Sequence, residues 1–227
     1  MMKSKEDFVI KHPYVLTDDD KASITKAVSK GLSTATWKDD ELKNFKSNIR
    51  EYLRERQNGY CAFCRMKVHD ENATGELEHF VNKAKRLDWM FLPKNLVFSC
   101  KLCNTSKSTK ETICNLHASN YPTNPNDFLL VYPYMDRYSE HIEIRNDIIY
   151  VGKTTKGKAT VDACHLNRLE VISARAENVI KSEAYGFVSV FLLVNNPAYA
   201  AVVEDKDKLI KRLRLKERIA DYKKKHK

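Results

Sequence analysis

The chain has 227 residues, of which 42% are hydrophobic and 31% charged, a balance that favours a folded protein over a disordered one. No apolar run approaches the roughly 20 residues of a membrane-spanning helix. The first residues, MMKSKEDFVI, lack the apolar core and the cleavage site of a secretory signal. We therefore expect a cytoplasmic protein that does not act at a membrane.

The net charge of +10 is concentrated at the C-terminal end. From Lys206 to Lys227, eleven Lys or Arg residues stand against three acidic residues, which gives +8 over 22 positions. Such a tail could bind nucleic acid by releasing counterions. A solvated basic helix explains the same residues equally well, so charge alone does not identify the partner.

The N-terminal region, 1–57, is predicted to be extended at first and then helical. Residues 1–17 look extended, and a helix is expected over 18–30. A second, amphipathic helix is expected from about residue 39 to residue 56, preceded by a capping box that begins at Thr36. Neither helix carries an obvious chemical motif.

The C-terminal region, 116–227, is predicted to begin with short strands and to end in helices. The expected elements are strands over 128–132 and 142–151 with a turn at Asn146-Asp147, a helical stretch over 160–193 broken near 165–167, and a charged helix over 198–222. Together with the segment 58–115 between them, the two flanking regions should make one compact unit, from which the last helix could project.

Six cysteines are present, and four of them form two CxxC pairs, namely Cys61, Cys64, Cys100 and Cys103. In a reducing compartment, two separated CxxC pairs favour one tetrahedral Zn²⁺ held by four thiolates, whereas a redox motif expects a single pair. Four protein ligands leave no position for water, so the zinc should be structural. Cys114 and Cys164 lie outside such pairs and are expected to be small buried side chains.

Between the two CxxC pairs lies the sequence GELEHF, which places Glu78 directly before His79. Strand alternation would put Glu76 on the same face as Glu78, where it is expected to be structural or exposed to solvent. Asn95 precedes the second CxxC pair, and the polar residues Asn104 and Lys107 follow it.

The combined pattern CxxC…EH…NL…CxxCN..K resembles that of the HNH, or His-Me finger, nucleases. The resemblance covers residues 58–110 and implies an α+β fold, with a small ββα-metal core, a structural zinc and flanking N-terminal and C-terminal helices. The roles that it implies are as follows: His79 as general base, Glu78 and Asn104 as ligands of a catalytic divalent ion, Asn95 as the residue that holds the His-bearing loop, and Lys107 as a basic group near the phosphate.

The residue types suit this chemistry. A neutral imidazole can take a proton from the attacking water. Mg²⁺ or Mn²⁺ prefers the oxygen ligands that Glu78 and Asn104 offer, and two protein ligands leave positions for water and phosphate. The sequence departs from the family where Glu78 replaces the more usual Asp. It also lacks a histidine soon after Asn104, because His117 is too far along the chain.

Two other functions fit the sequence. One is a zinc-stabilised nucleic-acid-binding module without catalysis, which would use the basic tail together with Lys83, Lys85 and Arg86. The other is a protein-docking module whose partner surface is the apolar stretch 169–194. The overall arrangement also resembles the HNH subunits of Septu-type bacterial anti-phage systems, which implies an ATPase partner. The leading prediction is a metal-dependent endonuclease that acts on DNA.

Overall fold

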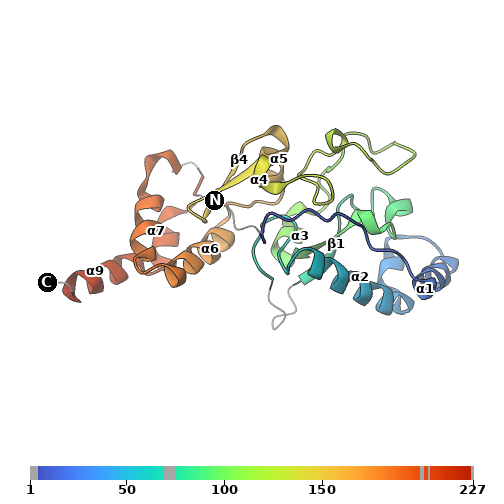
Figure 1. The fold of residues 1–227 in the computed structure, drawn as a ribbon, viewed down its shortest axis with the longest axis horizontal. Coiled ribbons are helices and arrows are strands. Elements are labelled where there is room, and N and C mark those ends of the chain that lie inside the picture. Colours follow the sequence, from blue (N-terminus) through green and yellow to red (C-terminus); the bar gives the residue numbers. More distant parts are fainter. Residues whose placement is uncertain (1–4, 69–74, 200–201, 204, 226–227) are drawn as a thin grey trace.

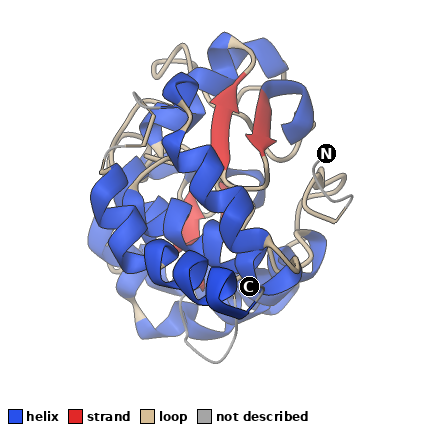
Figure 2. Cartoon of the chain, turned by 90° about the vertical axis from the view of Figure 1, so that its left-hand side faces the viewer, coloured by secondary structure: helices blue, strands red, loops and turns tan. Residues whose placement is uncertain are grey.

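The computed structural model describes residues 5–68, 75–199, 202–203 and 205–225 (Figure 1). The first four residues of the extended start and the last two residues of the basic tail lie outside these ranges. The fold is α+β, as expected, and helices dominate it (Figure 2). In the described ranges the strands form two antiparallel pairs.

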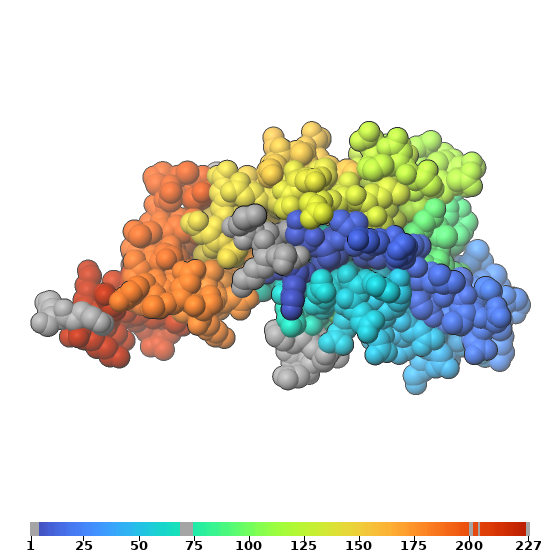
Figure 3. Space-filling model, in the orientation of Figure 1, coloured from blue at the N-terminus to red at the C-terminus, as the bar shows by residue number. Residues whose placement is uncertain are grey.

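The N-terminal segment crosses the middle of the molecule before the first helix begins (Figure 3). The Ile10 amide donates to the Pro133 carbonyl at 2.8 Å, which ties this segment to a distant loop. Helix α1, Asp18–Ser29, is capped by the Thr17 side chain. The helix ends where Gly31 takes a positive φ of 115°, a conformation that suits glycine, so the predicted helix is confirmed.

Helix α2 begins later than predicted, because it spans Lys43–Arg56. Two 3-10 turns, Thr34–Lys38 and Asp40–Leu42, occupy the residues before it. The capping box expected at Thr36 is wrong, since Ser33 is the cap and Thr36 donates back to Gly31. The predicted end at Arg56 is confirmed. The helix buries its apolar stripe, formed by Phe45, Ile49 and Leu53, and packs on strand β2, Leu96–Cys100.

The central element is a hairpin followed directly by a helix. Strand β1, Gly75–His79, pairs antiparallel with β2, and His79 lies opposite Leu96. Helix α3, Lys101–Lys107, begins at the residue after β2 and packs on both strands. Two 3-10 turns, Leu87–Trp89 and Pro93–Asn95, lie in the connection between the strands. This ββα arrangement brings the end of β1 close to the polar face of α3.

A second hairpin follows in the C-terminal region. Helix α4, Tyr138–His141, leads into β3, Ile142–Arg145, which pairs with β4, Ile149–Gly152. Asn146 and Asp147 take positive φ values of 50° and 58°, which is typical of a tight hairpin turn. The predicted strands and turn over 142–151 are therefore confirmed.

The strand predicted over 128–132 is wrong, although these residues are mostly buried. Phe128 makes one isolated bridge with Ile113. The Val131 amide instead donates to the Thr160 hydroxyl at 2.8 Å, and the Tyr132 amide donates to Asp136 at 2.7 Å. Side chains therefore satisfy backbone groups that a neighbouring strand would otherwise pair.

The expected helical stretch after the hairpin is divided more often than predicted. Its helices are α5, Thr155–Ala163, α6, Leu169–Ser182, and α7, Gly186–Asn195. The break near 165–167 is confirmed, and a second break at 183–185 was not predicted. The single charged helix expected over 198–222 is wrong: α8, Lys206–Arg212, and α9, Leu215–Lys225, are separated at Arg214, whose φ is 51°. Residues 200–201 and 204 of that prediction lie outside the described residues.

Hydrophobic contacts group the chain differently from the three predicted regions. One cluster, the core cluster, joins the N-terminal segment, α2, the first hairpin and residues up to Val171. The second cluster, the C-terminal lobe, is built from β4 and α6–α9 and includes Ile149, Val190 and Leu209. Figure 1 shows α9 at the far end of this lobe, away from the first hairpin. Residues 116–147 thus pack mainly with the core.

Candidate functional site

The four cysteines of the CxxC pairs come together beside the first hairpin. Their sulfur atoms all lie within 4.8 Å of one another, and the Cys64 and Cys100 sulfurs are 3.8 Å apart. Zn–S bonds of about 2.3 Å in a tetrahedron require sulfurs about 3.8 Å apart. The four thiols therefore form a metal-binding cluster that can hold one zinc ion, as predicted.

Local backbone structure explains why the first pair converges. The Arg65 amide donates to the Cys61 carbonyl at 3.1 Å, and the Cys61 amide donates to Met66 at 2.9 Å. Arg65 takes a positive φ of 54°, which tightens the turn. The second pair lies where β2 ends and α3 begins, so that Cys103 is one helical turn beyond Cys100.

Buried arginines surround the cysteine cluster. The Arg168 guanidinium lies 3.9 Å from the Cys103 sulfur, and Arg175 donates to the Cys64 carbonyl at 3.0 Å. Arg65 is fully buried and stacks on the Phe8 ring at 3.5 Å. Four thiolates around one Zn²⁺ carry a net charge of −2, and a buried charge needs nearby compensation. The arginines supply it from three different segments.

The remaining cysteines differ from each other. Cys164 is fully buried, as predicted, whereas Cys114 is exposed, so the prediction for Cys114 is wrong. The Cys114 sulfur lies 3.6 Å from the Asn126 carbonyl at the surface. Its neighbour Ile113 is buried instead and makes the isolated bridge with Phe128.

Three of the predicted site residues, Glu78, His79 and Asn104, line one open cleft of about 350 Å³. β1 contributes Glu76, Glu78 and His79, and α3 contributes Asn104. The hairpin and the following helix therefore gather four residues that are up to 28 positions apart in the chain. Asn95 and Lys107 lie beneath this cleft and not on its surface.

Asn104 and Glu76 are direct partners in the cleft. The Asn104 amide nitrogen donates to the Glu76 carboxylate at 2.7 Å. The Asn104 Oδ1 atom does not take part in this hydrogen bond, and its lone pairs can coordinate a cation. Glu76 was expected to be structural or solvent-facing, and it lies at the site itself. Its alternation with Glu78 along β1 was the signal for this position.

Glu78 and Lys107 form a buried ion pair. The Lys107 ammonium lies 2.6 Å from Glu78 Oε1, and the lysine side chain is fully buried. Burial raises the pKa of the Glu78 carboxyl, while the charge of Lys107 opposes this rise. Lys107 was expected near the phosphate, but its ammonium faces Glu78 and the Phe80 carbonyl. Lys107 can therefore act on a substrate only through Glu78.

His79 is 3% exposed and held from two sides. Its Nε2 atom lies 3.1 Å from the Met90 carbonyl. Because a carbonyl only accepts, Nε2 carries the proton and Nδ1 keeps the lone pair. The Trp37 ring meets the imidazole edge to face at 4.4 Å. Burial, reinforced by Lys83, lowers the pKa of His79 to about 3, so that the ring is neutral at neutral pH.

Asn95 binds the loop that follows His79. It is fully buried, accepts from the Val81 amide at 2.8 Å and donates to the Val81 and Trp89 carbonyls at 3.1 Å each. The Phe80 amide also donates to the Asn95 carbonyl at 2.7 Å. These contacts have the loop-holding geometry that the resemblance implied for Asn95.

Helix α2 supplies cleft residues that the sequence motif did not include. Trp37, just before this helix, and Lys46 and Arg50 within it line the same cleft as His79. The spacing of Lys46 and Arg50, each directly after a buried residue of the apolar stripe, was the available signal. The motif comparison missed them because they precede the first CxxC pair.

The predicted basic loop divides between two places. Lys83 lines the cleft with His79. Arg86 pairs with Asp88 and stacks on the Trp89 ring at 3.4 Å, and Lys85 lies 3.6 Å from Glu111. Both of the latter line a separate hollow with His117. Of Lys83, Lys85 and Arg86, Lys83 alone lines the cleft that contains His79.

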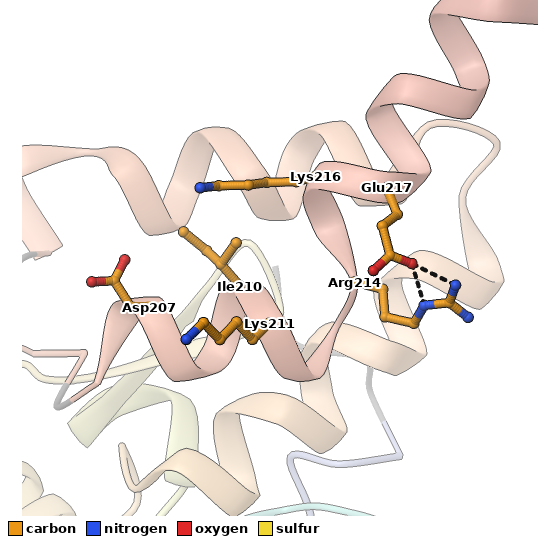
Figure 4. Close-up of a pocket in the computed structure, with 6 residues that line it drawn as sticks. All are labelled: Asp207, Ile210, Lys211, Arg214, Lys216 and Glu217. Atoms are coloured by element: carbon orange, nitrogen blue, oxygen red, sulfur yellow. Dashed lines mark hydrogen bonds and ion pairs between the residues drawn. The ribbon is translucent and has the colours of Figure 1, made fainter.

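The basic tail forms another hollow, of about 500 Å³, between α8 and α9. Arg214 at the bend is paired with Glu217, and the Lys211 and Lys216 side chains extend along the two helices (Figure 4). This hollow belongs to the C-terminal lobe. No predicted catalytic residue lines the hollow that the described part of the tail forms.

Two further observations concern metal ligands and membrane-spanning helices. Among the described residues, the four cysteines are the group of at least three His, Cys, Asp or Glu side chains whose ligand atoms converge. No helix within the described part of the chain is long and apolar enough to span a membrane.

Comparison with known proteins relates the chain by sequence to two Septu proteins. It is 34% identical over 129 residues to a Septu protein PtuB from Bacillus thuringiensis, a match that covers 55% of this chain and 43% of that protein. It is 22% identical over 166 residues to a Septu protein PtuA from Bacillus mycoides (strain KBAB4), covering 66% of this chain and 23% of that protein. No family model and no solved structure matches. The chain thus spans less than half the length of the curated relatives that it matches.

Proposed function

We propose that this protein is a metal-dependent endonuclease of the HNH type that hydrolyses phosphodiester bonds in DNA. The observation that carries the proposal is the convergence of His79, Glu78 and Asn104 in one cleft, on a hairpin and helix that the cysteine cluster joins. A zinc cluster that only stabilised a fold would need no neutral histidine with a free ring nitrogen beside two carboxylates.

The chemistry assigned to His79 follows from its tautomer. With Nε2 donating to Met90, Nδ1 takes the proton from the attacking water. The Met90 carbonyl and the Trp37 ring fix the orientation of the imidazole. The proposed base is therefore the Nδ1 lone pair, because the Met90 contact assigns the proton to Nε2.

Glu78 and Asn104 would hold a Mg²⁺ or Mn²⁺ ion, because both offer the oxygen atoms that hard cations prefer. When bound, such an ion supplies positive charge for the phosphate and the leaving oxygen. Lys107 fits this role, since its ammonium lies 2.6 Å from Glu78 Oε1 and opposes the rise in the Glu78 pKa that burial causes. Glu76 is a second carboxylate at the same place and orients Asn104.

We further propose that the nuclease is an effector of a Septu-like anti-phage system and acts with a separate protein partner. The similarity to proteins named Septu PtuB and PtuA supports this role. The earlier resemblance to HNH subunits held by an ATPase suggests the kind of partner. A restrained nuclease would also agree with a His79 side chain that is 3% exposed.

The same burial of His79 favours a second candidate, a zinc-stabilised DNA-binding module without catalysis. In that case Glu78 would be permanently neutralised by Lys107, and the cleft would bind phosphate groups without cutting. Removal of His79 should abolish DNA cleavage if the protein is a nuclease. It should leave DNA binding intact if the protein is a binding module.

The test is cleavage of supercoiled plasmid by wild type and by His79→Ala, with Mg²⁺, Mn²⁺ or no divalent ion. A general base contributes about 10²–10⁴-fold, so we expect metal-dependent cleavage by wild type and a loss of that size in the variant. His117→Ala is the matched control, because His117 is exposed and outside the cleft. Zinc content and thermal unfolding should be measured for each protein.

A second variant guards against simple misfolding of His79→Ala. Asn104 is only partly buried, and Asn104→Ala should fold while needing more Mn²⁺ for half-maximal cleavage. If His79→Ala keeps its zinc and cuts as fast as wild type, the assignment of the base is wrong. If wild type binds DNA but never cuts it, with or without candidate partners, the protein is the non-catalytic DNA-binding module.

A further inference from the structure

We propose that Lys46 and Arg50 of α2, together with Lys83, form a phosphate clamp that holds the DNA backbone across the cleft. This inference rests on the proposed function and adds the residues that bind its substrate. It also assigns a role to the N-terminal region, which carries none of the residues of the CxxC and EH motif.

The position of α2 brings the two side chains to the cleft. Phe45 and Ile49 are fully buried, and the residue after each of them, Lys46 and Arg50, lies on the same side of the helix at a four-residue step. The Gln57 side chain then fixes the helix end, because it both donates to and accepts from the backbone of Phe98 at 2.7 and 2.8 Å. The helix is therefore held rigidly against β2, beside the strand that carries His79.

The three cations are not neutralised by carboxylates. The Lys46 ammonium donates to the Trp37 carbonyl at 3.0 Å, which orients it while leaving its charge unpaired. Within the described residues, no ion pair involves Lys46, Arg50 or Lys83, whereas Lys26 pairs with Glu41 and Lys30 with Asp39. A phosphate can therefore bind these cations without first displacing a carboxylate from an ion pair.

The charges of the cleft are arranged for a polyanion. Its carboxylates are Glu76 and Glu78, of which Glu78 is already matched by Lys107 beneath it. The cations come from two separate segments, since Lys46 and Arg50 belong to α2 and Lys83 follows β1. A strand that placed one phosphodiester beside His79 would therefore meet cations at its neighbouring phosphates.

The test measures binding of a short fluorescein-labelled DNA duplex by fluorescence anisotropy. The titrations are made between about 0.05 and 0.2 M salt in buffer without added divalent metal. Each phosphate contact contributes about 0.9 to the slope of log K against log salt. We expect the double variant Lys46→Gln/Arg50→Gln to bind on the order of tenfold more weakly, with a slope smaller by about 2.

The control is Lys43→Gln/Lys158→Gln, which removes the same charge from exposed positions outside the cleft. It should bind with a nearly unchanged slope, because these lysines contact no phosphate. Equal slopes for the two double variants, or no DNA binding by wild type, would overturn the clamp. Thermal unfolding of each variant shows whether α2 remains in place.

Plasmid cleavage by the same proteins separates the clamp from the nuclease. If wild type cuts and the cleft double variant binds and cuts as well as the control, the clamp fails while the proposed function stands. If the slope falls as expected but wild type never cuts, the clamp stands as a DNA-binding surface and the proposed catalysis fails.

Discussion

The core cluster and the C-terminal lobe are stabilised by different means. In the core, four cysteines, buried arginines and a buried Glu78–Lys107 pair lie among the apolar side chains. In the lobe, short helices meet through aliphatic residues such as Val190 and Leu209, and its described ion pairs are exposed or partly exposed. The core therefore depends on a few specific polar contacts, whereas the lobe depends on the sum of many interchangeable apolar ones.

This difference follows from what each region has to do. A cleft with charged and titratable groups cannot be filled with apolar side chains, so the segment around it needs stabilisation from a metal cluster and from long-range hydrogen bonds. The described residues of the lobe do not surround a cleft of this kind, so the lobe needs no metal cluster. It can consist of amphipathic helices that bury one stripe each.

The largest expected effect is the loss of the zinc cluster in Cys64→Ser. Zinc binding by such clusters contributes about 10–16 kcal/mol, comparable with the about 5–15 kcal/mol of a whole domain. We expect the core to lose its zinc and its cooperative unfolding transition, measured by metal analysis and calorimetry. Cys114→Ser, at an exposed cysteine, should keep both; full zinc retention in Cys64→Ser would contradict a four-thiolate site.

The next effect is expected from Lys107→Met, which leaves the Glu78 carboxylate buried without its partner. Breaking one side of a buried ion pair costs about 3–5 kcal/mol, which should appear in urea unfolding. The double variant Lys107→Met/Glu78→Gln removes both charges and should recover much of that loss. If the single variant is as stable as wild type, the pair is not the polar contact on which the core depends.

A smaller and more local effect is expected from Leu209→Ala in the C-terminal lobe. Leu209 is fully buried, and truncation of a buried leucine costs about 2–5 kcal/mol. Hydrogen exchange should show weaker protection in α7 and α8, with zinc content and β1 unaffected. Loss of protection in β1 to the same degree would show that the two regions unfold as one, and the comparison would then fail.

The smallest effect is expected from Arg214→Met, which removes the exposed ion pair with Glu217 (Figure 4). Solvent screens such a pair, and measured contributions are close to zero. We expect no resolvable change in Tm. Set beside Lys107→Met, this variant compares a buried pair of the core with an exposed pair of the lobe, and a Tm loss as large as that of Lys107→Met would be inconsistent with screening.

Local patterns were enough to predict several elements. The three- and four-residue spacing of Phe45, Ile49 and Leu53 identified α2, and the Asn146-Asp147 pair identified the second hairpin. The CxxC spacing predicted the cysteine cluster, because a tight turn forces two sulfurs toward one point. Periodicity failed over 128–132, where Thr160 and Asp136, from elsewhere in the chain, satisfy the backbone.

Residue types at short spacing were enough to predict the four-cysteine cluster, the α+β class and the choice of His79, Glu78 and Asn104 as a candidate site. Tertiary structure alone decided that Lys107 lies under Glu78, that Glu76 contacts Asn104, and that Lys46 and Arg50 reach the cleft. Those contacts join segments far apart in the chain. Their geometry depends on how α2, the hairpin and α3 pack, which no local pattern encodes.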